Sequence, residues 1–335
     1  MTLQSTIEQH WYGAPGWLRV LLPLEIIYRS ITSLRRFLFR VGVFRSEKIA
    51  VPVIVVGNIT VGGTGKTPVV VALCSALKKA GYKPGIVSRG YGAEPPHIPF
   101  AVTAQSLAAE SGDEPLLLAL STDCPVVIAP DRVAAAKYLL SQNNCDVIIS
   151  DDGLQHYRLR RDFEIAVIDG ARGLGNGHCL PVGPLRESSA RLDHVDAVLV
   201  NTARASRDQL REPHYAFRLL PRAFVSLRDG REVSPSEWTQ QRVHAVAGIG
   251  NPGRFFNTLR ELGLDVIEHA FPDHHEFVAS DLKFRDALPV VMTEKDAVKC
   301  VGLASLAYES WYLSVDAVLP DSLINCMVGR ITAVR

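Results

Sequence analysis

Val51–Thr67 reads VPVIVVGNITVGGTGKT, an apolar, β-branched run followed by a glycine-rich segment that ends in Gly-Lys-Thr. An apolar helical pattern over Val69–Leu77 comes next. The order strand, glycine-rich loop, helix is typical of a phosphate-binding loop, because loop N–H groups and the positive end of the helix converge on phosphate oxygens. Lys66 then reaches the β- and γ-phosphates, and the Thr67 hydroxyl binds Mg²⁺. The predicted nucleotide-binding residues are Thr60, Gly62, Gly63, Thr64, Gly65, Lys66 and Thr67.

The match to the phosphate-loop pattern has one departure, because Thr60 stands where the pattern has its first glycine. The alternative interpretation is an ordinary glycine-rich turn. The strand before the loop and the helix after it favour the nucleotide site.

The composition is that of a globular chain of 335 residues, long enough for about two domains. Its formal net charge of +1 gives no support to a nucleic-acid partner. The six cysteines form no Cys-x-x-Cys pair, which indicates a reducing compartment and disfavours a zinc site.

Short β-rich runs alternate with helical patterns from residue 51 onward. This alternation predicts an α/β fold of the P-loop NTPase type, with a mostly parallel sheet and helices on both faces. The predicted strands are Val51–Val56, Gly85–Ser88, Val126–Ala129, Val147–Ser150, Ile165–Ile168 and Ala197–Val200, and the predicted helices are Pro68–Ala80, Glu114–Leu120 and Arg132–Ser141.

The pattern changes near residues 205–235. Two runs there, at 215–219 and 224–228, predict antiparallel strands or a linking ribbon. A second α/β alternation follows, with strands at Val243–Ile249, Val266–Phe271, Val290–Thr293 and Trp311–Val315 and a helix at Arg254–Leu262. We therefore expect a P-loop domain at 46–210, a β-ribbon linker at 211–235 and a smaller C-terminal α/β domain at 236–335.

The N-terminal region, residues 1–45, combines apolar and aromatic residues with clustered arginines. Arg19, Pro23, Glu25 and Arg29 interrupt the apolar run, so a membrane-spanning helix is not expected. The composition suits a helix that lies in the interface of an anionic membrane. The alternative is a helix packed on the protein with solvated arginines.

Asp151 and Asp152 follow an apolar run and precede a glycine. Carboxylates at the carboxyl end of a parallel strand face the ligand crevice of an open α/β sheet. Beside a phosphate loop, one of them would hold Mg²⁺, directly or through water, and the pattern leaves open which one. The alternative is an exposed Asp-Gly turn.

Three further motifs are ambiguous by themselves. Gly112-Asp-Glu-Pro115 precedes a helical run, and by itself an Asp at a helix start is more commonly a plain cap. Asp273-His-His275 suits acid–base chemistry or a surface loop, and no third metal ligand accompanies it. Leu180–Glu187, LPVGPLRE, ends in an Arg-Glu pair that suits phosphate recognition or a surface salt bridge.

Taken together, six motifs in this order resemble the tetraacyldisaccharide 4′-kinase family, the lipid A 4′-kinases of Gram-negative bacteria. Thr60 in the loop is also part of the family's pattern, and the resemblance runs from the N-terminal region through Thr293-Glu-Lys-Asp296. The motifs are Asn58–Pro68, Ser88–Gly92, Gly112–Pro115, Asp151–His156, Leu180–Glu187 and Phe271–His275.

The resemblance implies transfer of the γ-phosphoryl group of ATP to the 4′-hydroxyl of a tetraacylated glucosamine disaccharide 1-phosphate, giving lipid IVA. It implies a peripheral enzyme on the cytoplasmic face of the inner membrane, with ATP and Mg²⁺ as cofactors. No nucleic-acid partner and no obligate protein partner are expected.

The resemblance also assigns site residues. Lys66 would stabilise the transferred charge, Thr67, Asp151 and Asp152 would serve Mg²⁺, and Asp113 would help deprotonate the sugar hydroxyl in a dyad with His274. A substrate-binding role is expected for Tyr91, Glu114, Arg132, Gln155, His156, Arg186, Glu187 and Asp273.

Two other classes of protein share a phosphate loop. A GTPase or metallochaperone usually carries Asn-Lys-x-Asp, and the nearest stretch here, Thr293–Ala297, has Ala297 in place of the aspartate. A membrane-associated ATP-binding scaffold would bind ATP without lipid-dependent turnover. The presence of Asp113, Asp151, Asp152 and His274 argues against the scaffold.

Overall fold

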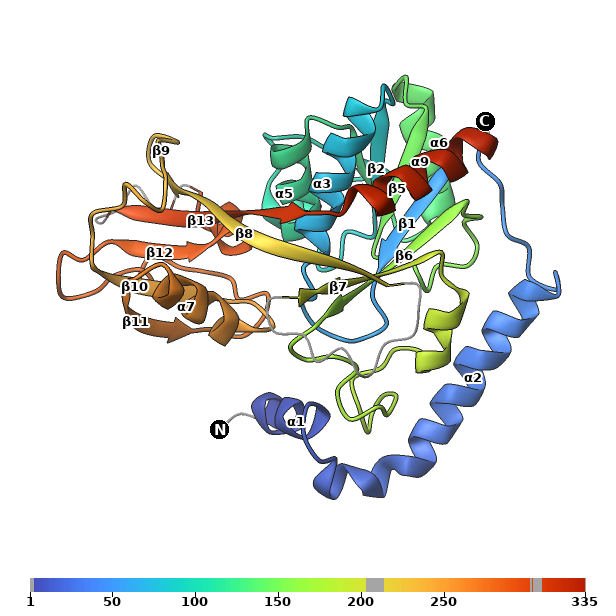
Figure 1. Cartoon of the computed structure of the whole chain (residues 1–335), viewed down its shortest axis with the longest axis horizontal. Helices are drawn as coiled ribbons and strands as arrows, with labels where there is room; N and C mark the ends of the chain where they lie inside the picture. The colour runs from blue at the N-terminus through green and yellow to red at the C-terminus, as the bar shows by residue number, and fades with distance from the viewer. Residues whose placement is uncertain (1–2, 203–213, 302, 304–308, 335) are drawn as a thin grey trace.

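The computed structural model describes residues 3–202, 214–301, 303 and 309–334. Within these residues one 13-stranded mixed sheet runs through the whole molecule in the order β11-β10-β12-β13-β8-β7-β6-β1-β5-β2-β4-β3, and β9 pairs with β8 (Figure 1). The strands are β1 Val53–Gly57, β2 Pro84–Ser88, β3 Phe100–Val102, β4 Val126–Ile128, β5 Val147–Asp151, β6 Phe163–Asp169, β7 Ala197–Asn201, β8 His214–Ser226, β9 Glu232–Val233, β10 Arg242–Ala247, β11 Asp265–Ala270, β12 Val290–Thr293 and β13 Ser310–Val318.

The first half of the sheet confirms the predicted parallel arrangement. β1 lies between β5 and β6 and is parallel to both, which places the end of β1 beside the end of β5. All six strands predicted before residue 205 are present within a few residues of their expected bounds. The antiparallel edge strand β3, which is three residues long, was not predicted.

A single long strand, β8, joins the two halves. Its first residues pair in parallel with β7, and the rest pairs antiparallel with β13. The run at 215–219 and the start of the run at 224–228 both lie in β8, so two separate strands are not formed there, and the β-ribbon linker expected at 211–235 stays a prediction. Pro221 lies inside β8 at a shift of register opposite Ser314 and Val315, where its missing N–H is tolerated.

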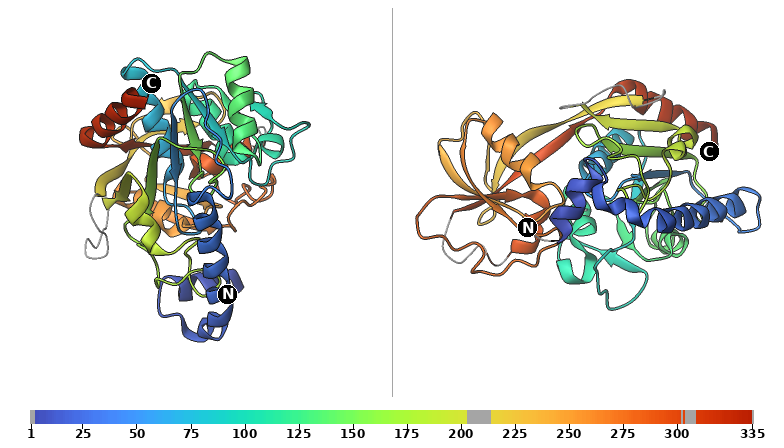
Figure 2. Two further views of the ribbon diagram at one scale, coloured as in Figure 1. Left: turned by 90° about the vertical axis from the view of Figure 1, so that its right-hand side faces the viewer. Right: turned by 90° about the horizontal axis from the view of Figure 1, so that it is seen from below.

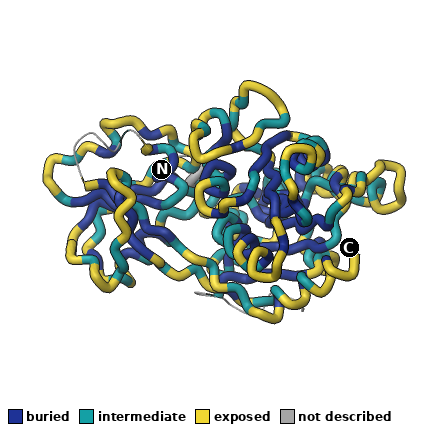
Figure 3. Tube along the Cα trace, turned by 90° about the horizontal axis from the view of Figure 1, so that it is seen from above, coloured by how far each residue is buried: buried dark blue, intermediate teal, exposed yellow. Residues whose placement is uncertain are grey.

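Helices cover both faces of the first half. On one face α3 (Lys66–Lys79), α5 (Asp113–Thr122) and the C-terminal α9 (Asp321–Val334) share one apolar core, and α6 (Arg132–Gln142) packs into the core of the other face. Figure 3 shows the buried strands of both halves surrounded by exposed loops. The short α4 (Ala108–Ser111) precedes α5.

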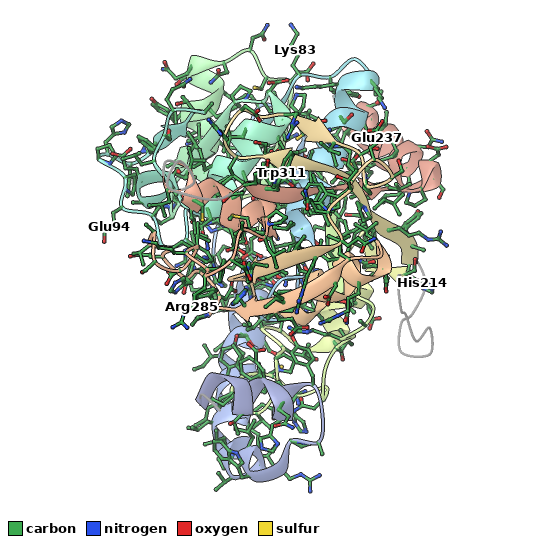
Figure 4. The ribbon with its side chains drawn as sticks, turned by 90° about the vertical axis from the view of Figure 1, so that its left-hand side faces the viewer. Lys83, Glu94, His214, Glu237, Arg285 and Trp311 are labelled. Atoms are coloured by element: carbon green, nitrogen blue, oxygen red, sulfur yellow. The ribbon has the colours of Figure 1, made fainter. Side chains whose placement is uncertain are left out.

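In the second half, α7 (Pro252–Glu261) and α8 (Glu294–Cys300) pack in two separate apolar clusters. Trp311, labelled in Figure 4, is buried in the cluster that contains α7. α9 follows this half in the chain and returns to the first half, where Leu323, Met327 and Ile331 are buried. The predicted division at residues 46, 211 and 236 stays a prediction.

The N-terminal region forms α1 (Leu3–Trp11), a 3₁₀ turn (Gly16–Leu21) and α2 (Leu22–Arg40), which project from the body of the protein (Figures 1 and 2). None of the described helices is both long enough and apolar enough to span a membrane. One face of α2 is attached to the protein. Buried Glu25 accepts the Cys179 N–H at 2.9 Å, and the Tyr28 hydroxyl donates to the Arg186 carbonyl at 2.7 Å.

The return of α9 yields a prediction about stability. Replacing Met327, which has no exposed surface, by Ala should lower the free energy of unfolding by about 2–5 kcal/mol, because it leaves a cavity between α9 and α3. Urea denaturation would measure the loss. The matched change Asn325→Ala on the exposed face of α9 should alter stability by about 0.5 kcal/mol or less. Equal stability of both variants would contradict the packing of α9 on this core.

Candidate functional site

The phosphate loop lies between β1 and α3. Gly65 caps α3 with a φ of 88°, a left-handed conformation that a glycine adopts without strain, so the Lys66 N–H begins the helix. The Lys66 side chain is buried, with Nζ 3.3 Å from Asn58 Oδ1 and 3.6 Å from Asp152 Oδ1. Thr64 Oγ1 is buried and has no hydrogen-bond partner among the described residues. The loop thus places a lysine, the buried Thr64 hydroxyl and a helix N-terminus close together.

Asp151 ends β5 beside the phosphate loop and is 1% exposed. The Ser88 hydroxyl donates to its Oδ2 at 3.2 Å, whereas Oδ1 has no partner within the described part of the chain. Burial, with the charges of Glu114 and Asp152, raises the pKa of Asp151 to about 7. Such a carboxyl needs a cation beside it to be fully ionised at neutral pH.

Asp152 has the opposite environment. Its φ of 47° turns the side chain toward Lys66 and Arg186, and Arg186 Nη1 donates to both carboxylate oxygens, at 2.9 and 3.2 Å. Burial would raise the pKa of Asp152, but Lys66 and Arg186 outweigh it and lower the pKa to about 2. Asp152 is therefore a permanent anion that holds the two cations in place.

A second cluster forms where α5 of the first half meets the loop after β11. His274 Nδ1 lies 3.3 Å from Asp113 Oδ2, and the His274 ring lies 5.6 Å from the ring of Tyr91, centroid to centroid. Burial would raise the pKa of Asp113, but the hydrogen bond with His274 and the charges of Lys299 and Lys295 lower it. Asp113 is consequently a carboxylate at neutral pH.

Lys295 of α8 belongs to the same cluster and was missed as a functional residue in the sequence. Its Nζ lies 3.1 Å from Glu114 Oε1, 3.4 Å from Asp273 Oδ1 and 3.4 Å from His274 Nε2. The available signal was its position just after a strand, in the Thr293-Glu-Lys-Asp296 stretch at which the family resemblance ends.

One cavity of about 1320 Å³ joins the two clusters. Lys295 lines it, and so do most of the predicted residues. Those are Gly62, Gly63, Thr64, Gly65, Lys66, Thr67, Tyr91, Asp113, Glu114, Asp151, Asp152, Gln155, Arg186, Glu187, Asp273 and His274.

Three predicted residues lie behind the cavity wall. Thr60 is buried and forms a β-bridge with Leu185, which joins the phosphate loop to the Leu180–Glu187 loop. Arg132 is 3% exposed and donates to the carbonyl oxygens of Asp151 and Asp152, at 3.5 and 3.3 Å. Burial and the charge of Arg132 lower the pKa of His156 to about 4, so its ring is neutral. Their contacts support the backbone of the site.

The residues at the phosphate loop fit Mg²⁺. Among the described residues no three His, Cys, Asp or Glu side chains form a metal cluster. Mg²⁺ at a phosphate site, however, takes one or two carboxylates together with phosphate and water oxygens. The unpartnered Asp151 Oδ1 and the Thr67 hydroxyl, both at the cavity, supply such a donor set. The site can therefore bind a nucleotide with its metal and present its terminal phosphate to the Asp113–His274 pair.

The comparisons with known proteins agree with this chemistry. A family model described as tetraacyldisaccharide-1-P 4′-kinase, LpxK, matches residues 17–332. The tetraacyldisaccharide 4′-kinase of Pseudomonas putida strain W619 is 50% identical over 319 residues, covering 95% of this chain and 93% of that protein. That of Pseudomonas aeruginosa strain LESB58 is 49% identical over 333 residues, covering 99% and 98%.

A solved structure shares the fold. The crystal structure of LpxK from Aquifex aeolicus in complex with ATP has a TM-score of 0.79 and 30% sequence identity, and covers 94% of this chain and 99% of that chain. Because the family model and these relatives match nearly the whole length, the chain belongs to the tetraacyldisaccharide-1-P 4′-kinase family, kinases of lipid A biosynthesis.

Proposed function

We propose that the cavity holds ATP on the 62–67 loop and the 4′-hydroxyl of a tetraacyldisaccharide 1-phosphate beside Asp113, and that the γ-phosphoryl group passes between them. Kinase activity follows from the family, and the proposal concerns the residues that carry it out. Its main support is that one cavity is lined by Lys66, Asp151, Asp113 and His274, which come from four separate segments. The relative from Aquifex aeolicus, whose crystal structure contains ATP, supports the choice of nucleotide.

Charge stabilisation is assigned to Lys66 and Arg186. Phosphoryl transfer spreads negative charge over the equatorial oxygens of the moving group, so fixed cations account for much of the catalysis. Both side chains are oriented by Asp152, which lies within 3.6 Å of Lys66 Nζ and 2.9 Å of Arg186 Nη1. Thr67 and Asp151 would hold Mg²⁺, which when bound neutralises charge on the nucleotide phosphates.

Asp113 is assigned as the acceptor of the hydroxyl proton, with His274 as its partner. Its lowered pKa makes it a weak base, which suits a loose transition state that needs little proton removal before the phosphorus–oxygen bond breaks. Positioning of the hydroxyl should therefore contribute more than base strength.

The first test is phosphate transfer from γ-labelled ATP to tetraacyldisaccharide 1-phosphate in detergent micelles. Asp113→Ala should lower kcat by about 10²–10⁴-fold with a small change in KM for ATP, because general-base assistance is lost and the phosphate loop is intact. Lys66→Ala serves as the control that abolishes transfer. A well-folded Asp113→Ala enzyme with wild-type kcat would remove Asp113 from the mechanism.

The buried Asp151 gives a pH-dependent prediction. Its folded pKa of about 7 exceeds the value of about 3.9 for an unfolded aspartate, so its contribution to stability is present at low pH and is lost as pH rises through 7. In the absence of Mg²⁺ and nucleotide, Asp151→Asn should raise the melting temperature more at pH 8 than at pH 5. A gain of the same size at both pH values would contradict the raised pKa. The variant should also lose kinase activity.

We also infer that α2 places the enzyme on the cytoplasmic face of the inner membrane. Leu24, Ile27, Ile31 and Leu34 recur at helical spacing on α2, and each is more than half exposed. The exposed Trp17 and Val20 precede them, and exposed arginines accompany them. Such an apolar stripe beside basic residues suits burial at an anionic lipid interface. The acyl chains of the substrate could then stay in the bilayer.

Flotation with anionic liposomes tests this placement. Ile27→Ser with Ile31→Ser should lower the bound fraction at least several-fold, because each change removes apolar area that enters the interface. Both side chains are exposed, so the melting temperature should stay near that of the wild type. The matched control is Val301→Ser with Val318→Ser, two exposed valines of the other half. Equal flotation of the two double variants would contradict a membrane role for α2.

A further inference from the structure

Lys295 is the one lysine of the Asp113–His274 cluster that contacts both halves of the protein and the imidazole, as far as the described residues show. Burial would lower the pKa of Lys295, but the carboxylates of Glu114 and Asp273 raise it. The amine is therefore an ammonium, a group with three donors and no acceptor.

This charge state determines which nitrogen of His274 carries the proton. Because Lys295 Nζ can only donate, His274 Nε2 at 3.4 Å must accept. The ring hydrogen then lies on Nδ1, which donates to Asp113 Oδ2 at 3.3 Å. The imidazole has a donor on one side and an acceptor on the other, and together these contacts select one tautomer.

We propose that Lys295 is a positioning residue of the phosphotransfer reaction, which holds His274 in the tautomer that leaves Asp113 as the proton acceptor. The proposal rests on the role proposed above for Asp113. In the reaction the 4′-oxygen forms a bond to the γ-phosphorus, the bond from that phosphorus to the departing ADP oxygen breaks, and the hydroxyl proton passes to Asp113. His274 cannot take that proton through Nε2 while Lys295 donates to it.

The neighbouring Lys299 does not duplicate this function. Its Nζ lies 2.8 Å from Asp296 Oδ1, donates to the His275 carbonyl at 3.1 Å and is 3.9 Å from Asp113 Oδ2. It therefore contributes charge near Asp113 and is held away from the imidazole. Lys66 acts from the far side, where its charge and that of Lys295 lower the pKa of Glu114 although burial would raise it.

The same contacts make Lys295 a connection between the halves. Glu114 comes from α5 of the first half, whereas Asp273, His274 and Lys295 come from the second. Separation of α5 from α8 would remove Glu114 from Lys295 and Asp113 from His274 together. The tautomer is consequently set in the arrangement in which both halves line the cavity.

The experiment compares Lys295→Met, Lys295→Arg and the exposed-lysine control Lys283→Met in the full-length protein. The ¹⁵N resonances of the histidine rings, with His274 assigned through His274→Gln, report the tautomer without any need for turnover. Wild type and Lys283→Met should show His274 protonated at Nδ1 alone. Lys295→Met should lose that pattern, and Lys295→Arg, which still donates, should keep most of it.

In the transfer assay, kcat of Lys295→Met should fall about 10- to 100-fold, less than the 10²–10⁴-fold that a general base supplies, and Lys295→Arg should recover part of the loss. KM for ATP should change less than about threefold, because the phosphate loop is untouched. A wild-type ring pattern in Lys295→Met would overturn the proposal, and so would an unchanged kcat. A loss seen mainly in KM for ATP would also overturn it and make Lys295 a nucleotide ligand.

The two arms separate this proposal from the role of Asp113. If Asp113→Ala were fully active, Asp113 would be excluded as the proton acceptor. The ¹⁵N resonances of the His274 ring would still show whether Lys295 sets the tautomer. A changed ring pattern with wild-type kcat in Lys295→Met would show that the tautomer has no part in the reaction.

Discussion

Two adjacent carboxylates at the end of β5 impose the main electrostatic constraint on this protein. Neighbouring anions in a buried place cannot both be ionised without cations beside them. Asp152 turns out of the strand at a positive φ and lies beside two cations, Lys66 and Arg186. Asp151 stays in the strand, and its Oδ1 has no partner among the described residues. The pKa of Asp152 is therefore lowered to about 2, whereas that of Asp151 is raised to about 7. Asp152 thereby holds Lys66 and Arg186 in place, and Asp151 is the carboxylate to which the proposed function assigns Mg²⁺.

The same principle governs the contact between the two halves. The first half brings Asp113 and Glu114 to the cavity. The second half places His274, Lys295 and Lys299 beside them. Burial would raise the pKa of both carboxylates, but second-half groups lower it for Asp113, and Lys295 together with Lys66 of the first half lowers it for Glu114. The charges of the two halves therefore attract one another in this arrangement, and the same contacts keep Asp113 ionised.

Much of the fold and part of the site could be predicted from local sequence. The strand, glycine loop and lysine are contiguous, and the Asp151–Asp152 pair follows an apolar run, so both could be read by inspection. Contacts between segments that are distant in the sequence could not be predicted in this way. The role of Lys295 depends on the packing of α8 against α5, which brings it to Glu114, a residue 181 positions earlier in the chain. The single strand β8 was obscured by Pro221, which ordinarily argues against a strand interior. The resemblance assigns a substrate-binding role to Arg132 and His156, which stays a prediction, and the structure places both residues behind the cavity wall.

The N-terminal helix connects the proposed membrane face to the reacting centre. α2 exposes its apolar stripe on one side. On its other side the Tyr28 hydroxyl donates to the Arg186 carbonyl, and Arg35 donates to the Gln155 carbonyl at 3.2 Å. Both carbonyls belong to loops that line the cavity. If α2 lies in the lipid interface as proposed, a helix attached in this way would set the distance between that interface and the phosphate loop, which a flexible tether would leave variable. The headgroup of the proposed substrate would then meet Asp113 at a defined depth while its acyl chains stay beside α2.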